Sequence, residues 1–136
     1  MNRPLTLLVE DTPTHQKILS NFLECEGFIV YTAENCVTAL RFLTQFKPDV
    51  LITNLSLPGM TGLELIRRIK GTKQLTDIPI VAIDNSKSYR ANDVMDAGAS
   101  AILRKPINLA LLMKTLTKTC AFLKRTESCE TTEVRV

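Results

Sequence analysis

Short apolar runs alternate with amphipathic stretches five times along the chain. The runs hold three to five residues, mostly β-branched or aliphatic, and polar or turn residues bound them, which is typical of strands. Because they are hydrophobic almost throughout, we expect both faces of each strand to be buried, as in a parallel sheet. The predicted strands are Leu5–Val9, Phe28–Thr32, Val50–Thr53, Ile80–Ile83 and Ala101–Leu103.

The stretches that follow these runs carry apolar residues at intervals of three and four positions, which predicts helices with one buried face. The first helix is expected to begin around Pro13, which suits a first helical turn, and Asn35 is the predicted N-cap of the second. A weaker fourth helix is predicted over residues 88–97. The apolar faces hold Ile18, Leu19, Phe22 and Leu23; Val37, Leu40, Leu43 and Phe46; Leu63, Ile66 and Ile69; and, in the fifth helix, Leu109, Leu112, Leu116 and Leu123. The glycines expected to end helices are Gly27, Gly71 and Gly98.

Strands and helices in alternation predict one three-layer α/β domain with right-handed crossovers. The length of 136 residues suits one domain, and 45% apolar with 23% charged residues argues against disorder. We expect the domain to span residues 1–124, followed by a polar, frayed tail over residues 125–136.

Composition narrows the class of protein. The net charge of +3 is too small for the basic stripe of a nucleic-acid-binding domain, so we expect no direct contact with nucleic acid. No segment has the length of a signal peptide's apolar region or a membrane span, which predicts a cytoplasmic protein without a membrane contact. The cysteines lack metal-ligand spacing and are expected to be reduced and mostly small core residues: Cys25, Cys36, Cys120 and Cys129.

Polar residues follow four of the predicted strands and should meet at one edge of the sheet, where open parallel sheets bind ligands. Glu10 and Asp11 follow the first strand, residues 54–59 the third, Asp84 the fourth and Lys105 the fifth. Paired acids suit a hard cation such as Mg²⁺, and a lysine can neutralise an anionic oxygen. Solvated acids with a structural salt bridge are the alternative, but the gathering of all these residues favours a functional or formerly functional site.

These residues, together with several ordered motifs, resemble the receiver domain of bacterial two-component response regulators from about Leu5 to Leu123. The resemblance implies a (βα)5 flavodoxin-like fold with a five-stranded parallel sheet in the order 2-1-3-4-5. The motifs are Leu7-Leu8-Val9-Glu10-Asp11, Lys47-Pro48-Asp49-Val50-Leu51-Ile52, Leu57-Pro58-Gly59-Met60-Thr61-Gly62-Leu63-Glu64-Leu65, Ile78-Pro79-Ile80, Ala97-Gly98-Ala99 and Lys105-Pro106.

In this family an aspartate after the third strand accepts a phosphoryl group from a histidine kinase, and two acids after the first strand hold Mg²⁺. The resemblance assigns these metal positions to Glu10 and Asp11, with the backbone carbonyl of Ser56 as a further ligand. Lys105 matches the lysine that contacts phosphoryl oxygens, and a cis peptide is expected between Lys105 and Pro106.

The sequence departs from the family pattern at three positions of the switch. Asn54 stands at the phosphoacceptor position, and an amide is a poor nucleophile that cannot form an acyl phosphate. Asp84 replaces the Ser or Thr whose hydroxyl contacts the phosphoryl group, and Ile102 replaces the aromatic switch residue. One change could be engineered, but three losses in one mechanism predict a natural pseudo-receiver. With Asn54 as a neutral ligand, we expect no cofactor beyond a weakly bound Mg²⁺ at most.

Two hypotheses concern Asp84. The first pairs its carboxylate with Lys105, which would hold the loop after the fourth strand in one conformation. The second has Asp84 pointing into water as a helix-capping acid. His15, the single histidine, is interpreted as a surface helix residue without a catalytic partner.

The leading functional prediction is an interaction module without enzymatic activity that binds a protein partner, either a signalling protein or a second copy, independently of phosphorylation. The resemblance implies that the fourth helix, fifth strand and fifth helix form the partner face, with Arg90, Lys114 and Lys118 upon it. One alternative is a working receiver that is phosphorylated on another acid. A second is a nucleotide- or flavin-binding domain, although acids rather than glycines or hydroxyls follow the first strand.

Overall fold

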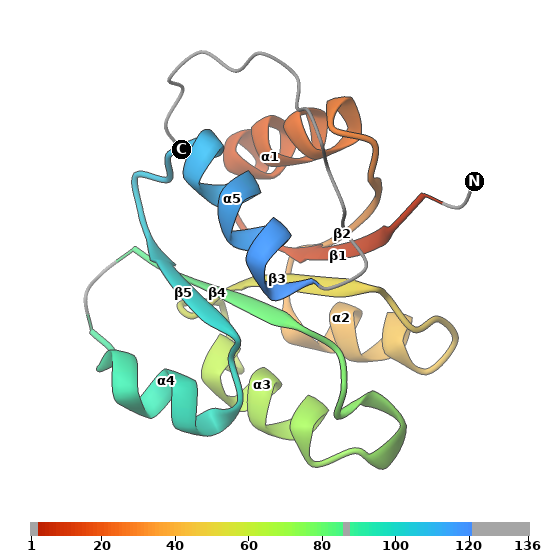
Figure 1. Cartoon of the computed structure of the whole chain (residues 1–136). Helices are drawn as coiled ribbons and strands as arrows, with labels where there is room; N and C mark the ends of the chain where they lie inside the picture. The colour runs from red at the N-terminus through yellow and green to blue at the C-terminus, as the bar shows by residue number, and fades with distance from the viewer. Residues whose placement is uncertain (1–2, 86–87, 121–136) are drawn as a thin grey trace.

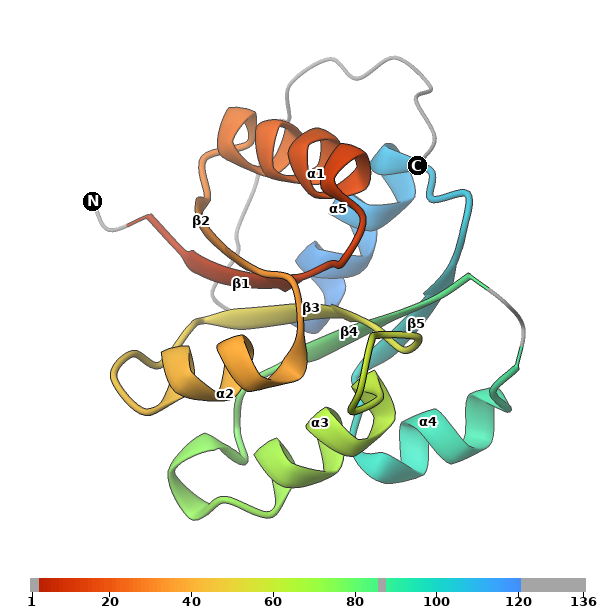
Figure 2. The same cartoon turned by 180° about the vertical axis from the view of Figure 1, so that it is seen from behind.

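The computed structural model describes residues 3–85 and 88–120 and shows a five-stranded parallel sheet in the order β2-β1-β3-β4-β5. Helices α1 and α5 cover one face of this sheet, and α2, α3 and α4 cover the other (Figures 1 and 2). The predicted three-layer fold and strand order are therefore confirmed. The elements are β1 (Leu5–Val9), α1 (Pro13–Cys25), β2 (Ile29–Ala33), α2 (Cys36–Leu43), β3 (Val50–Asn54), α3 (Gly62–Lys70), a 3₁₀ turn (Lys73–Leu75), β4 (Ile80–Asp84), α4 (Ala91–Ala97), β5 (Ala101–Arg104) and α5 (Leu109–Thr119).

The strands lie within one residue of the predicted bounds at each end. Complete burial holds for the central β3 and β4 and nearly for β1, but the prediction is wrong for β2 and β5. Both of these strands lie at edges of the sheet, where only one side has a strand neighbour. An apolar run predicts a strand but not its place in the sheet. Edge strands can be as apolar as central ones and still remain partly exposed to solvent.

Most predicted helix ends are confirmed. Pro13 is the first residue of α1, and the side chain of Asn35 caps α2 by accepting a hydrogen bond of 2.8 Å from the N–H of Thr38. Gly71 directly follows α3, and Gly98 follows α4 with a φ of 124°. The fourth helix begins at Ala91, three residues after the predicted start. Leu123 of the predicted fifth helix lies outside the described residues, as does the predicted tail.

Two apolar clusters form the core, one on each face of the sheet. Cys36 and Cys120 are buried in them, whereas Cys25 is exposed, so the prediction of a core role is wrong for Cys25. Val37 and Phe46 were predicted to face the core but are 58% and 50% exposed. Among the described residues, no helix is long and apolar enough to span a membrane.

Candidate functional site

The predicted site residues lie together at the carboxyl ends of four strands. Glu10 follows β1, Asn54 ends β3, Asp84 ends β4, and Lys105 follows β5. All but Lys105 are nearly inaccessible to solvent, although each is polar. Such groups must be satisfied by partners within the protein, since burying a polar group without a hydrogen bond is costly.

The Asn54 side chain joins the two acids that follow β1. Its Nδ2 donates one hydrogen bond of 2.8 Å to Oε2 of Glu10 and another of 3.2 Å to Oδ1 of Asp11. Its Oδ1 is buried and has no hydrogen-bond partner among the described residues. The amide is therefore oriented by the carboxylates, since two bonds to charged acceptors outweigh one unsatisfied carbonyl.

Lys105 occupies the other side of Glu10. Its Nζ donates to Oε1 of Glu10 at 2.9 Å and lies 2.8 Å from Nδ1 of His15 in α1. The lysine side chain is 9% exposed, so little water competes with these contacts. His15 lies on α1 and is half-buried, and its contact with Lys105 brings it to the site, which the interpretation as a surface helix residue did not foresee. The cis peptide between Lys105 and Pro106 is confirmed.

Asp84 pairs with Arg104 rather than with Lys105. The two carboxylate and guanidinium atoms lie 2.5 Å apart, and the Asp84 side chain is fully buried. Asp84 and Arg104 are register partners of β4 and β5, so their side chains lie on the same face of the sheet. Lys105 is the next residue, and alternation turns its side chain away. Both earlier hypotheses for Asp84, the Lys105 pair and the solvated cap, are therefore wrong.

The two remaining predicted positions lie close to the site without joining its polar network. Ser56 is half-buried in the loop that follows β3, and Ile102 of β5 is half-buried against the apolar cluster on the α3 side of the sheet. Tyr89, a residue that the sequence did not single out, packs against the same apolar cluster as Ile102. Its hydroxyl donates a hydrogen bond of 3.4 Å to the carbonyl oxygen of Leu55. An aromatic side chain thus reaches the loop after β3 from the segment before α4 instead of from β5.

The residues at the implied metal position do not fit a divalent cation as they are arranged. A cation held by Glu10 and Asp11 would replace the Asn54 N–H groups that now bind both carboxylates. Lys105 already neutralises the other oxygen of Glu10. Within the described part of the chain, no group of three or more His, Cys, Asp or Glu side chains is placed to hold a metal ion.

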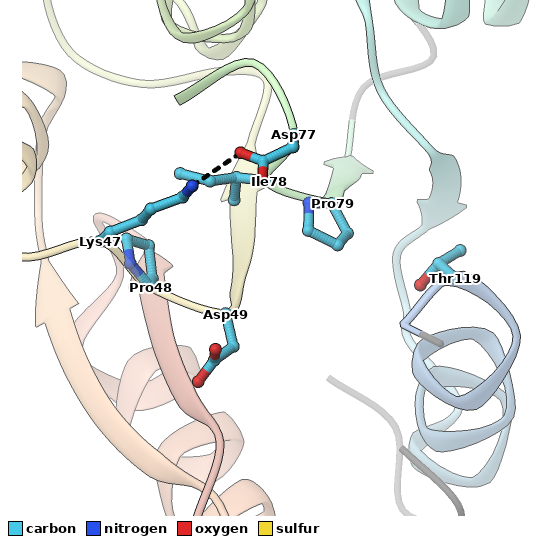
Figure 3. A pocket seen from close by; sticks show the side chains of 7 residues that line it. All are labelled: Lys47, Pro48, Asp49, Asp77, Ile78, Pro79 and Thr119. Carbon is cyan, nitrogen blue, oxygen red and sulfur yellow. Dashed lines mark ion pairs between the residues drawn. The ribbon is translucent and has the colours of Figure 1, made fainter. Parts of the chain in front are cut away.

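A separate cavity of about 550 Å³ lies at the opposite, amino-terminal ends of β3 and β4 (Figure 3). Its charged groups already have partners within the protein. Lys47 forms an ion pair of 2.9 Å with Asp77, and the carboxylate of Asp49 accepts a 2.7 Å hydrogen bond from the N–H of Leu5. Because these groups stabilise the ends of the strands, we assign no ligand to this cavity.

Comparison of the sequence with models of known protein families identifies the family of this chain. The model of the response regulator receiver domain matches residues 6–117. The chain belongs to this family. The resemblance stated from the sequence is thus confirmed at the level of a receiver-type signalling domain.

Relatives of this receiver domain come from bacteria and from a plant. The chain is 30% identical over 112 residues to protein PilH of Pseudomonas aeruginosa, covering 81% of the chain and 92% of PilH. It is 29% identical over 117 residues to the two-component response regulator ARR17 of Arabidopsis thaliana, covering 76% of each protein. The structure of chemotaxis response regulator CheY4 of Vibrio cholerae superposes with a TM-score of 0.81 at 28% identity, covering 87% and 99% of the two chains. A bacterial source and a cytoplasmic location stay predictions.

Proposed function

We propose that this receiver domain signals without phosphorylation at the end of β3, and that it acts by binding a protein partner. Family membership supports the signalling class, while the chemistry of the site supports the mode of action. The observation that carries the proposal is the pair of hydrogen bonds from Asn54 to Glu10 and Asp11.

The residue at the end of β3 lacks the nucleophile of the family. In the family the aspartate at this point attacks phosphorus with a carboxylate oxygen. The amide of Asn54 has a delocalised nitrogen lone pair and no anionic oxygen, so it cannot form an acyl phosphate. The loss of the nucleophile removes the chemical step itself, whatever the geometry around it.

The groups around Asn54 that would contact a phosphoryl group already have other partners. A phosphoryl group would need Lys105 and a hydroxyl donor nearby, but Lys105 is engaged by Glu10 and His15. The residue in the hydroxyl position is Asp84, whose carboxylate carries no proton to donate and is paired with Arg104. Lys105 and Asp84 are thus engaged by partners within the protein, so neither is left to bind an incoming phosphoryl group.

The proposed partner surface lies at the edge of the sheet that β5 forms, which is the edge opposite to β2. β5 forms that edge, with α4 on one face and α5 on the other (Figure 1). Met95 and Leu111 are 42% and 49% exposed on these helices. The basic residues Arg90, Lys114 and Lys118 are also exposed. The α4 part of this surface also carries the exposed acids Asp93 and Asp96, so the basic character belongs to α5. The exposed Leu111 beside the lysines of α5 suits an acidic protein partner.

The experiment compares intact masses of the native chain and Asn54→Asp after incubation with Mg²⁺ and acetyl phosphate. We expect no added phosphoryl group on the native chain at any time point. A phosphorylated native chain would overturn the proposal, and peptide mapping would then identify the acceptor, with Glu10 and Asp11 as the nearest acids. Asn54→Ala is the matched control, because it lacks a nucleophile and also lacks the amide.

A further inference from the structure

β2 is an edge strand whose outer backbone groups have no strand neighbour among the described residues. The N–H of Ile29 donates to Pro4 and the carbonyl of Ala33 accepts from Glu10, so Ile29, Tyr31 and Ala33 turn their backbone groups towards β1. Strand alternation then turns the N–H and C=O groups of Val30 and Thr32 outward. An open edge of this kind is a template for pairing with another strand.

The edge lacks the features that usually prevent such pairing. β2 contains no charged residue and no proline. Beside it, the rings of Tyr31, Phe42 and Phe46 form one cluster, with centroids 5.2 to 6.2 Å apart. Ile29, Tyr31 and Phe46 are 39%, 46% and 50% exposed. A neutral strand beside an exposed aromatic cluster favours an apolar contact with another protein surface.

The strand is complementary to itself. If two copies of β2 run antiparallel about a two-fold axis at Tyr31, Val30 of one copy lies opposite Thr32 of the other. Because both residues face outward, each such pair exchanges two backbone hydrogen bonds. The two Tyr31 side chains meet as a pair without backbone bonds, where side chains approach most closely. No like charges oppose each other along the strand.

Charged residues at the two ends of the strand specify this antiparallel direction. Arg3 lies at the beginning of β2, where its guanidinium donates to the carbonyl oxygens of Gly27 and Phe28 at 3.2 and 3.1 Å. Glu34 directly follows the end of β2, and both residues are exposed. Antiparallel pairing brings the beginning of one strand beside the end of the other, so Arg3 of each copy faces Glu34 of its partner.

We infer that two copies of this chain associate through antiparallel pairing of their β2 strands, which forms one continuous ten-stranded sheet. The contact joins the open edges of β2, the two aromatic clusters and two Arg3–Glu34 pairs. It leaves the proposed partner surface on α4, β5 and α5 accessible, and it does not depend on the chemistry at Asn54. The association is isologous, since the same surface patch serves both copies.

Sedimentation velocity of the full chain over a range of concentrations tests the inference. We expect a dimer that dissociates on dilution. Tyr31→Lys should leave only monomer at concentrations where the native chain is dimeric, because two positive charges then oppose each other at the axis. Thr32→Pro should act likewise, because it removes an outward N–H without removing a bond to β1. Thermal unfolding of each variant checks that it remains folded. Leu111→Lys on α5 is the matched control and should remain dimeric.

A charge exchange tests the antiparallel direction. Arg3→Glu and Glu34→Arg alone should each weaken dimerisation, roughly tenfold. The double variant should regain an affinity within about threefold of the native chain, because the pairs re-form with reversed sign. A monomer at all concentrations would overturn the inference. The inference would also be wrong if Leu111→Lys abolished the dimer while Tyr31→Lys did not. It would likewise be wrong if the double variant dimerised as weakly as the single variants.

Discussion

Asn54 differs from an aspartate by one nitrogen in place of one oxygen, and this exchange turns an acceptor into a donor. A carboxylate at the end of β3 would add a third anion beside Glu10 and Asp11 and would require a cation between them. The amide instead donates to both acids at 2.8 and 3.2 Å. A single atom therefore accounts for the loss of the nucleophile and for the hydrogen bonds that join the end of β3 to both acids.

The ion pair between Asp84 and Arg104 makes a quantitative prediction about coupling. A double-mutant cycle of Asp84→Ala with Arg104→Ala should give an interaction energy of about 1–3 kcal/mol, because the Asp84 side chain is buried and the two groups touch. The same cycle with Lys105→Ala in place of Arg104→Ala should give less than about 0.5 kcal/mol. Urea unfolding measures both. Equal coupling in the two cycles would contradict the assignment of Arg104 as the partner.

The thiols should differ strongly in reactivity. Burial raises the pKa of the Cys36 thiol to about 11, and its Sγ donates to the carbonyl oxygens of Met60 and Thr61. Burial also raises the pKa of Cys120. With iodoacetamide at neutral pH, we expect Cys25 to react at least ~100-fold faster than Cys36, because the thiolate is the nucleophile.

Peptide mapping after a timed reaction measures each rate separately, and the same reaction in urea is the control in which the difference should disappear. Rapid alkylation of Cys36 in the folded chain would mean that the contact between α2 and the loop after β3 opens readily.

At the scale of elements, the beginning of α3 is packed directly against the end of β3. A Cβ atom at Gly62 would lie 1.9 Å from the carbonyl oxygen of Asn54 and 2.8 Å from Cα of Leu55. Neither is the end of a flexible side chain, so the backbone itself would have to move. The close approach of α3 and β3 thus requires glycine at this position, and the packing of α3 against the backbone of Asn54 restricts the movement of that backbone.

Gly62→Ala should therefore lower the free energy of unfolding by roughly 1–3 kcal/mol or more. Gly71→Ala, at the other end of the same helix, is the matched control. There the new Cβ would lie 3.2 Å from the carbonyl oxygen of Arg67, and a small shift relieves the contact. Chemical denaturation of the two variants compares them, and an equal loss at both positions would contradict this account of the α3–β3 contact.

Elements were predictable where a local pattern determines them. The apolar run at Leu5–Val9 and the cap at Asn35 are properties of neighbouring residues, and both are confirmed. The exposure of β2 was missed because edge position is set by strand order across the whole sheet. The Asp84 partner was missed for a related reason. Strand register decides which of two consecutive basic residues shares the face of Asp84, although the alternation of Arg104 and Lys105 at the end of β5 was a usable signal.

At the scale of the whole molecule, the two edges of the sheet have different proposed binding functions. β5 with its two flanking helices serves a protein partner, and β2 serves a second copy. At the carboxyl ends of the strands lies a site in which Glu10 pairs with Lys105 and Asp84 pairs with Arg104. Under the proposed function, the domain would work as a scaffold with fixed surfaces, instead of a switch that moves when it is phosphorylated.

The central claim is that the side-chain N–H groups of Asn54 bind the carboxylates of Glu10 and Asp11 and thereby prevent a cation from binding there. The NMR signals of the Asn54 side-chain amide test this claim most directly. These signals are identified in a ¹⁵N-correlated NMR spectrum by their absence from Asn54→Asp. As Mg²⁺ is raised to several millimolar, the account predicts that they neither shift nor broaden in the native chain, while backbone amides near Glu10 respond in Asn54→Asp. A saturable shift of the native Asn54 signals at submillimolar Mg²⁺ would show that a cation displaces the amide and would contradict the account.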